Sequence, residues 1–183
     1  MGDFVIKNSV LTKYTGTDAD VAIPDGVTGI GKYAFYFSTS LTSVTIPNSV
    51  TTIGPGAFSG CKKLMSVTIP DSVTVIDSKA FSECSRLMSI AIPNSVTVIG
   101  GSAFYGCTNL KDVTIPESVT AIGEYAFKRC TNLTSAIIMG SAATIGEYAF
   151  SGCSRLTHVT ILDGVTAIGS GAFYGCTSLT GVI

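Results

Sequence analysis

A period of 23 residues runs through almost the whole chain and limits what it can fold into. The stretch that begins at Leu41 reads LTSVTIPNSVTTIGPGAFSGCKK. Further copies of this pattern begin at Leu64, Leu87, Leu110, Leu133 and Leu156. A degenerate copy occupies residues 18–40, and an incomplete one begins at Leu179. Self-similarity at a fixed period of this length is typical of a solenoid, in which each repeat packs on its neighbours.

Each copy has the same set of small or apolar positions, which in the second copy are Leu41, Val44, Ile46, Val50, Ile53, Ala57, Phe58 and Cys61. The spacing of two between Val44 and Ile46 predicts a short strand, which Pro47 should end because it has no N–H to donate. A second extended stretch should end at Gly54. The Gly-x-x-Ala-Phe-x-x-Cys segment spaces apolar residues by three, which fits a short helical or 3₁₀ turn.

These local signals predict a mainly β solenoid of 23-residue right-handed coils, each with short parallel strands and one short helical turn. The chain, 1–183, is expected to be a single domain without internal linkers. Seven repeats should span 18–178, and 179–183 should start a truncated repeat.

Both ends of the solenoid carry a prediction of their own. The first residues, 1–17, should form a β-hairpin cap, because two apolar runs flank the tight turn at Asn8-Ser9. At the other end an uncapped coil would expose core and an unpaired strand edge. We therefore expect the protein to continue beyond Ile183, or that end to pack on a second copy of the chain.

Composition excludes several classes of protein. Hydrophobic residues make up 46% of the chain, which is ample for a buried core. The net charge of −1 argues against a nucleic-acid partner, because phosphate binding needs clustered Lys and Arg. No apolar run approaches the roughly 20 residues that a membrane-spanning helix needs, and Met1-Gly2-Asp3 does not begin a signal peptide.

The pattern LxxVxIPxSVTxIGxxAFxxC resembles the BspA-like, or Treponema-type, leucine-rich repeats found in surface proteins of anaerobic bacteria and some protists. The opening FVIKNSVLTKYTG resembles a segment that often precedes such repeats. The chain departs from the pattern locally at 138–142, Leu162, Asp77 and Ser38. The resemblance implies a leucine-rich-repeat solenoid without a catalytic motif. It also implies adhesion or recognition at a cell surface or in a secreted protein, with host proteins or other microbial surface proteins as partners.

The cysteines share one register of the repeat: Cys61, Cys84, Cys107, Cys130, Cys153 and Cys176. Stacking brings neighbouring Cα atoms to about 5 Å, within reach of a disulfide. Parallel stacking points neighbouring side chains the same way, however, so we expect a column of buried free thiols and keep disulfides as the alternative. Without a CxxC motif and with a single histidine, we expect no metal site and no cofactor.

No residue pattern predicts catalysis. His158 should lie on the exposed side of a strand, next to the buried Val159. A nucleophilic mechanism needs a base held by a third group, with a nucleophile within reach. The cysteines should face the opposite side of the sheet, and carboxylates such as Asp71 and Glu117 fall at turns. We expect no enzymatic activity from these residues.

The exposed strand positions are the candidate binding surface, because this strand lines the usual recognition face of leucine-rich repeats. The predicted partner-binding residues are Ser43, Thr45, Met65, Ser66, Thr68, Met88, Ser89, Lys111, Asp112, Thr114, Ser135, His158 and Thr160. The alternative is that Ser and Thr merely suit an exposed strand. Ice binding by a regular Ser-x-Thr array is disfavoured, because Ala91 and Ile137 interrupt the ranks.

The leading functional hypothesis is a non-catalytic protein-binding or adhesion domain of a cell-surface protein. An intracellular, cytoplasmic scaffold that organises other proteins through the same solenoid is the alternative. A third possibility is a repeat module attached to an enzyme outside these residues.

Overall fold

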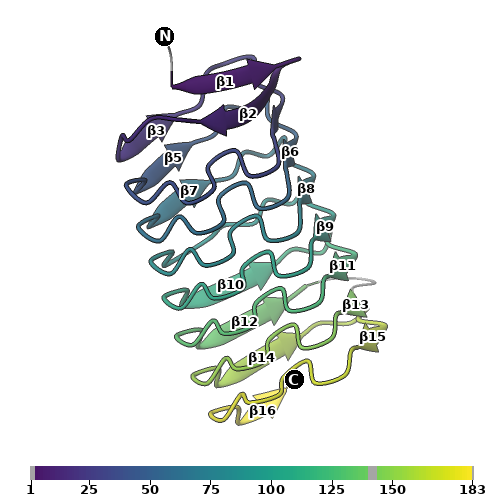
Figure 1. Ribbon diagram of the computed structural model, residues 1–183. Helices are drawn as coiled ribbons and strands as arrows, with labels where there is room; N and C mark the ends of the chain where they lie inside the picture. Colours follow the sequence, from purple (N-terminus) through teal and green to yellow (C-terminus); the bar gives the residue numbers. More distant parts are fainter. Residues whose placement is uncertain (1–2, 140–143, 183) are drawn as a thin grey trace.

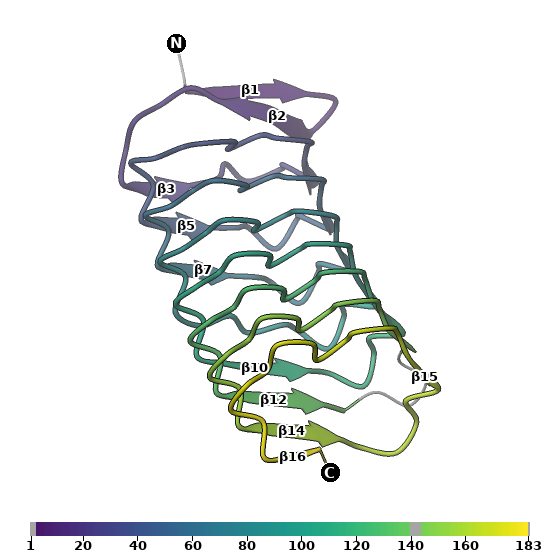
Figure 2. The ribbon, with the colours of Figure 1, turned by 60° about the horizontal axis from the view of Figure 1, so that its bottom comes forward.

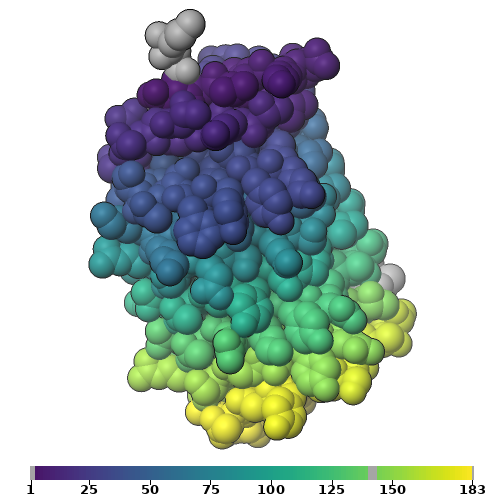
Figure 3. All heavy atoms as spheres, in the orientation of Figure 1, coloured from purple at the N-terminus to yellow at the C-terminus, as the bar shows by residue number. Residues whose placement is uncertain are grey.

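The computed structural model describes residues 3–139 and 144–182. Successive coils stack into a solenoid, with a hairpin at the N-terminal end and the last strand at the other (Figures 1 and 2). The space-filling view shows the coils as successive bands from the N-terminus to the C-terminus (Figure 3). The predicted mainly β solenoid with its N-terminal hairpin is confirmed. The sequence departure at Gly140–Ala142 lies outside the described residues.

One strand from each coil joins a sheet along one side of the solenoid. Its members are β1 (Phe4–Lys7), β2 (Val10–Tyr14), β4 (Gly29–Ile30), β6 (Thr52–Ile53), β8 (Val75–Ile76), β9 (Val98–Ile99), β11 (Ala121–Ile122), β13 (Thr144–Ile145) and β15 (Ala167–Ile168). From β2 onward the strands are parallel, and each pairs with the equivalent residues one coil later. These are the second extended stretches of the sequence pattern.

The other strand of each coil forms two shorter sheets. The first contains β3 (Asp20–Ala22), β5 (Ser43–Thr45) and β7 (Ser66–Thr68). The second contains β10 (Asp112–Ile115), β12 (Ser135–Ile138), β14 (His158–Ile161) and β16 (Gly181–Val182).

A strand expected at residues 89–91 is absent, and this gap separates the two shorter sheets. The preceding backbone hydrogen bond, from Met88 N to Met65 O, is long at 3.4 Å. Ile90 occupies a core position where the neighbouring coils have Val67 and Val113.

The N-terminal hairpin covers the first coil. β1 and β2 are antiparallel, and the turn residues Asn8 and Ser9 have φ of 48° and 60°. Two consecutive left-handed residues are what a tight hairpin turn requires. The Tyr14 ring packs on Phe35 at 5.1 Å, so the hairpin extends the aromatic core by one layer.

The predicted short helical turn is replaced by a run of tight turns, and no helix occurs in the part of the chain that the structure describes. In the second coil, Ala57 N and Cys61 N donate to carbonyls three residues back, as a 3₁₀ turn would. The intervening Gly56 and Gly60 have φ of 60° and 76°. Their N–H groups point out of the coil and donate to carbonyls of the next one at 2.8 Å. Bonding between coils therefore prevents a helix.

We call these stretches the turn segments. They span residues 31–38, 54–61, 77–84, 100–107, 123–130, 146–153 and 169–176. The glycine that opens most of them is required by close packing. A Cβ at Gly123 would lie 2.5 Å from Gly101 N, a distance that real side chains do not tolerate.

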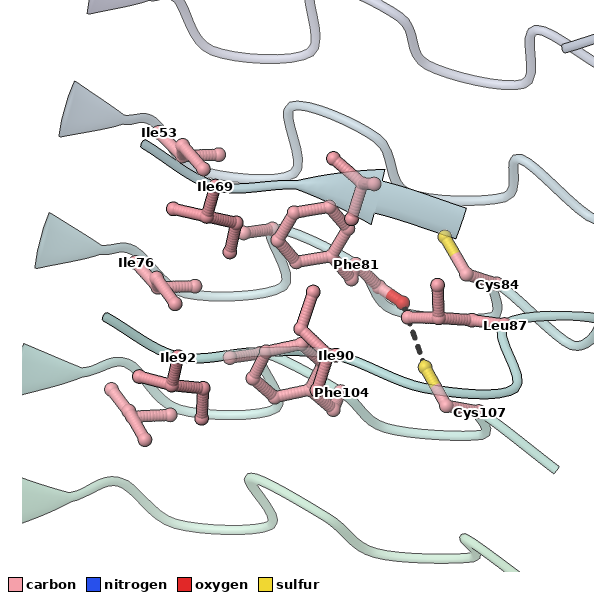
Figure 4. Packing of buried hydrophobic residues seen from close by; sticks show 14 of the residues in the cluster. Ile53, Ile69, Ile76, Phe81, Cys84, Leu87, Ile90, Ile92, Phe104 and Cys107 are labelled. Atoms are coloured by element: carbon pink, nitrogen blue, oxygen red, sulfur yellow. Dashed lines mark hydrogen bonds between the residues drawn. The ribbon is translucent and has the colours of Figure 1, made fainter. Parts of the chain in front are cut away.

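One phenylalanine from each coil builds a continuous column through the core, and Figure 4 shows two of its members, Phe81 and Phe104. Phe81 and Phe104 stack with ring centroids 5.4 Å apart and planes within 5° of parallel. The same arrangement recurs between every pair of neighbours from Phe35 to Phe173. Offset-stacked rings contribute beyond their burial, so each ring stabilises the coils on both sides.

The cysteines form the predicted column of free thiols. Each thiol donates a hydrogen bond to the phenylalanine carbonyl of the preceding coil, such as Cys107 Sγ to Phe81 O at 3.2 Å (Figure 4). Burial raises the pKa of Cys61 to about 12, and it also raises the pKa of Cys84 and Cys107. A thiol that stays protonated and hydrogen-bonded is a poor nucleophile and metal ligand. These cysteines are therefore part of the core.

Replacing Phe104 by alanine should lower the free energy of unfolding by about 3–5 kcal/mol, because it empties a fully buried position and removes two ring stacks. Chemical denaturation measures the change. Tyr174→Ala is the control, since that ring is 73% exposed and its loss should cost less than about 0.5 kcal/mol. Equal effects of the two substitutions would contradict the column.

The raised thiol pKa predicts a loss of stability in alkali. The Cys61 thiol has a pKa of about 12 in the folded protein and an ordinary pKa of 9.0, so its contribution to stability is complete below pH 9 and disappears as the pH rises toward 12. The unfolding free energy should therefore fall more steeply above about pH 9 in the wild type than in Cys61→Ala, by about 1.4 kcal/mol per pH unit. Denaturation curves at about pH 8 and pH 10 measure both slopes. Identical slopes would show that Cys61 is not held protonated.

Candidate functional site

The candidate surface is the exposed side of β3, β5, β7, residues 89–91, β10, β12 and β14, which we call the strand face. In these strands the residues that face the core, such as Val44 and Val113, are buried, and the residues on either side of them point outward onto the strand face. Most of the predicted partner-binding residues are exposed, while Ser43, Ser135 and Thr160 are half-buried.

Pairing in register arranges these residues in two ranks. One rank runs through Ser43 and Ser66 and, beyond the gap, through Asp112, Ser135 and His158. The other contains Thr45 and Thr68, then Thr114, Ile137 and Thr160. Residues from distant parts of the sequence therefore meet on one surface, as predicted, although the gap at 89–91 divides it.

Hydrogen bonds hold the N-terminal end of this surface in place. The hydroxyls of Ser43 and Thr42 donate to Asp20 Oδ1 at 2.6 and 3.0 Å. These bonds hold the pKa of Asp20 below its usual value, with that from Ser43 having the larger effect. Asp20 was not among the predicted residues, because it lies in the degenerate first repeat.

The residue just before each strand has a structural role in some coils and none in others. The hydroxyls of Thr134 and Thr157 donate to the backbone carbonyl one coil earlier, at 3.1 and 3.0 Å. In the central coils the same position holds Met65, Met88 and Lys111, which are all exposed. The centre of the surface therefore has side chains that are not needed to join coils.

A shallow groove runs along this edge of the strand face. One part, of about 420 Å³, lies between Met88, Lys111 and Arg155, and a second part, of about 230 Å³, continues to Met65 and Arg86. The two parts share Met88 and Asn109, so the groove is continuous. Exposed methionines are adaptable contact residues.

Four residues of this groove were missed by the sequence reasoning: Arg86, Asn109, Asn132 and Arg155. They occupy one register, immediately before the leucine that opens each copy, and this regularity was the available signal. Asn132 Nδ2 donates to Thr108 O at 2.7 Å, and Arg155 Nη1 donates to Asn132 Oδ1 at 2.9 Å. The polar wall of the groove is thus preorganised.

Most exposed charges of opposite sign lie at opposite edges of the strand face, apart from the carboxylates of Asp20 and Asp112 at the start of β3 and β10. The edge where the strands begin carries exposed cations, namely Lys62, Lys63, Arg86, Lys111 and Arg155. The edge beyond their ends carries exposed carboxylates, namely Asp25, Asp71, Glu117 and Asp163. A charged partner would therefore be oriented as well as attracted by this surface.

The chemistry of the surface is that of contacts. His158 Nδ1 lies 2.8 Å from Thr157 Oγ1, a neighbour in the chain, and the ring is exposed. Within residues 3–139 and 144–182, no three His, Cys, Asp or Glu side chains are grouped to hold a metal ion. Those same residues include no helix of the length and apolarity needed to cross a bilayer.

Comparison with known proteins supports the fold assignment. The model of the BspA type leucine rich repeat region matches residues 6–134 and 84–183, with six copies. No curated protein matches the chain. The crystal structure of the leucine-rich-repeat protein TpLRR from Treponema pallidum is similar with a TM-score of 0.90 and 34% identity, over 96% of this chain and 86% of that one.

Two other solved structures are similar at lower identity. A leucine-rich-repeat protein from Bacteroides ovatus has 27% identity and a TM-score of 0.59, over 95% of this chain and 65% of its own. The pneumococcal vaccine antigen PcpA shares the fold at 17% identity and a TM-score of 0.72, over 91% of this chain and 46% of its own. With its repeat register, its coil geometry and the family model in agreement over nearly the whole chain, this protein belongs to the BspA-type leucine-rich-repeat family.

Proposed function

We propose that this chain is a non-catalytic protein-interaction module that binds its partner through the strand face, as an adhesion or recognition domain of a surface or secreted protein. The observation that carries the proposal is the groove beside the strands, where Met65, Met88 and Lys111 are exposed at a position that structural threonines fill elsewhere.

The architecture suits this role. Many inter-coil hydrogen bonds and the buried aromatic column hold the strand face rigid, so binding would cost little ordering entropy. A surface of hydroxyls and methionines between a basic edge and an acidic edge favours a protein partner, which offers both apolar and charged groups. A similar solved structure is described as a leucine rich cell surface protein, from Faecalibacterium prausnitzii, at 26% identity over 98% of this chain and 73% of that one, with a TM-score of 0.53.

A charged pair of substitutions tests the binding surface. Thr68→Arg with Ser89→Arg places two bulky cations on exposed strand-face positions without touching the core. Affinity for immobilised extracellular-matrix proteins and for whole host cells should fall about tenfold or more, as measured by biolayer interferometry and cell-binding assays.

The matched control is Asn48→Arg with Asn94→Arg, which adds the same charge at exposed positions beyond the strand ends. This control should bind like the wild type, and both variants should melt within a few degrees of it. Wild-type affinity in the Thr68 and Ser89 double variant would contradict binding through the strand face.

Antibody labelling of intact source cells, with permeabilised cells as the control, tests the surface location. Labelling without permeabilisation is expected if the domain faces the outside of the cell. A signal seen only after permeabilisation would exclude the adhesion role and would favour the intracellular scaffold.

A further inference from the structure

The turn segments present a second surface with a different composition. Every tyrosine in the chain except Tyr14 lies on them, together with the exposed Phe37. This aromatic strip consists of Tyr33, Tyr36, Phe37, Tyr105, Tyr125, Tyr148 and Tyr174. The strand face, by contrast, has no aromatic residue apart from His158. The aromatic side chains are therefore concentrated on a surface that the strand-face interaction does not use.

Several of these residues occupy an unfavourable backbone conformation. Tyr33, Phe37 and Tyr148 have φ of 57°, 54° and 52°, in the left-handed region. Glycine fills the equivalent positions in the second coil, at Gly56 and Gly60. The repeat imposes this conformation at both positions, because Lys79, Glu83, Ser102 and Arg129 adopt it in later coils, and glycine enters it most freely. The aromatic residues therefore occupy positions where glycine would adopt the backbone conformation at a lower free-energy cost.

The rings at the N-terminal end of the strip lie flat on the next coil. A Cβ added to Gly56 would collide with the Tyr33 ring, and one added to Gly60 would lie 2.9 Å from Phe37 Cδ2. Both glycines are buried beneath these rings, yet Tyr33 and Phe37 are 43% and 51% exposed. Each ring is therefore supported from below and open to solvent above. Tyr36 packs edge-on against Phe37 at 4.6 Å and completes the cluster.

A groove of about 430 Å³ separates this cluster from Tyr105, which lies three coils further on, or about 14 Å along the solenoid. Small hydroxyl residues line the space between, at Ser59, Ser82 and Ser102. Lys79 and Glu83 complete the lining, so the groove contains one cation and one anion.

The far wall of the groove is held in position by neighbouring side chains. Arg129 Nη1 donates to the Tyr105 hydroxyl at 3.2 Å. Beyond it, Lys128 Nζ lies 4.6 Å from the centre of the Tyr125 ring and 5.6 Å from that of Tyr148. The Tyr105 ring that closes the groove is therefore held by Arg129 of the next coil, while Tyr125 and Tyr148 lie outside the groove.

We propose that this groove binds a neutral oligosaccharide. The electron-rich faces of flat aromatic rings attract the polarised C–H groups on the face of a sugar ring. The serine hydroxyls, the Glu83 carboxylate and the Lys79 ammonium supply both donors and acceptors for sugar hydroxyls. The balanced charge disfavours a polyanionic ligand. The groove thus offers exposed aromatic ring faces together with three serine hydroxyls, the combination that a sugar ring with C–H faces and peripheral hydroxyls can use.

This site is independent of the strand face, so a carbohydrate and a protein could be bound by different sides of one module. The test first applies the 183-residue protein to a glycan array of neutral oligosaccharides. Titration calorimetry then measures the affinity for cellohexaose, xylohexaose, N-acetylchitohexaose and any glycan that binds on the array. Because the chain lacks tryptophan, intrinsic fluorescence comes from its tyrosines and reports ring stacking directly. Binding by at least one neutral glycan, with a change in tyrosine emission, is expected.

The variant Tyr33→Gly with Phe37→Gly removes two rings and leaves residues that the backbone conformation prefers. Its melting temperature should stay within a few degrees of the wild type, because relief of the left-handed conformation offsets the lost ring contacts, while its affinity for the glycan falls about tenfold or more. Tyr148→Gly is the matched control, because it relieves the same conformation outside the groove and should retain affinity within about twofold.

Three results would overturn the proposal. The first is an array without any neutral glycan bound. The second is unchanged affinity in the Tyr33 and Phe37 double variant, or an equal loss in Tyr148→Gly. The third is a loss of protein-partner binding in the double variant without glycan binding by the wild type, which would make the strip a protein interface.

Discussion

Hydrogen bonding and stacking between each coil and the next are the constraints on which the rest of the structure depends. A single coil has neither a closed sheet nor a filled core, and its buried phenylalanine has no ring to stack on. Within the stack, the Phe58 N–H donates to Ala80 O at 2.8 Å, and the Phe58 ring lies 5.2 Å from Phe81. The fold is therefore a sum of similar interfaces, each worth little without its neighbours.

This constraint divides the polar residues into two groups. Hydroxyls such as those of Thr97 and Thr157 donate to carbonyls one coil earlier and join the stack. The exposed side chains at the centre of the strand face, such as Met65 and Met88, do not make such hydrogen bonds between coils. The same repeat thus presents two different surfaces, one rich in hydroxyls and methionines and one rich in tyrosines. Separate faces of a rigid module can then recognise separate classes of ligand.

Much of the fold followed from the repeat. The fixed register placed the core residues and the thiol column correctly, because equivalent apolar positions stack on one another in a solenoid. The hairpin cap, which lies outside the repeat, followed from the two apolar runs that flank Asn8-Ser9. The turn segments were predicted as helical, since apolar residues spaced three apart fit a 3₁₀ turn as well as they fit the observed run of tight turns. What decides against the helix is the hydrogen bond from Gly56 N to Ser78 O, a partner in another coil. The gap at residues 89–91 was not predicted either, because those residues follow the repeat pattern.

The sequence by itself determined the solenoid, its register and the face on which each side chain lies, because a period of 23 residues repeats those choices identically. Only the tertiary structure decided which exposed residues meet. The groove at Met88 and Arg155, the segregated charges at the two edges and the tyrosine strip combine residues from several coils. Such surfaces depend on differences between copies rather than on what the copies share. Stacking brings the differing residues of adjacent coils to about 5 Å from one another, and this proximity cannot be read from one repeat alone.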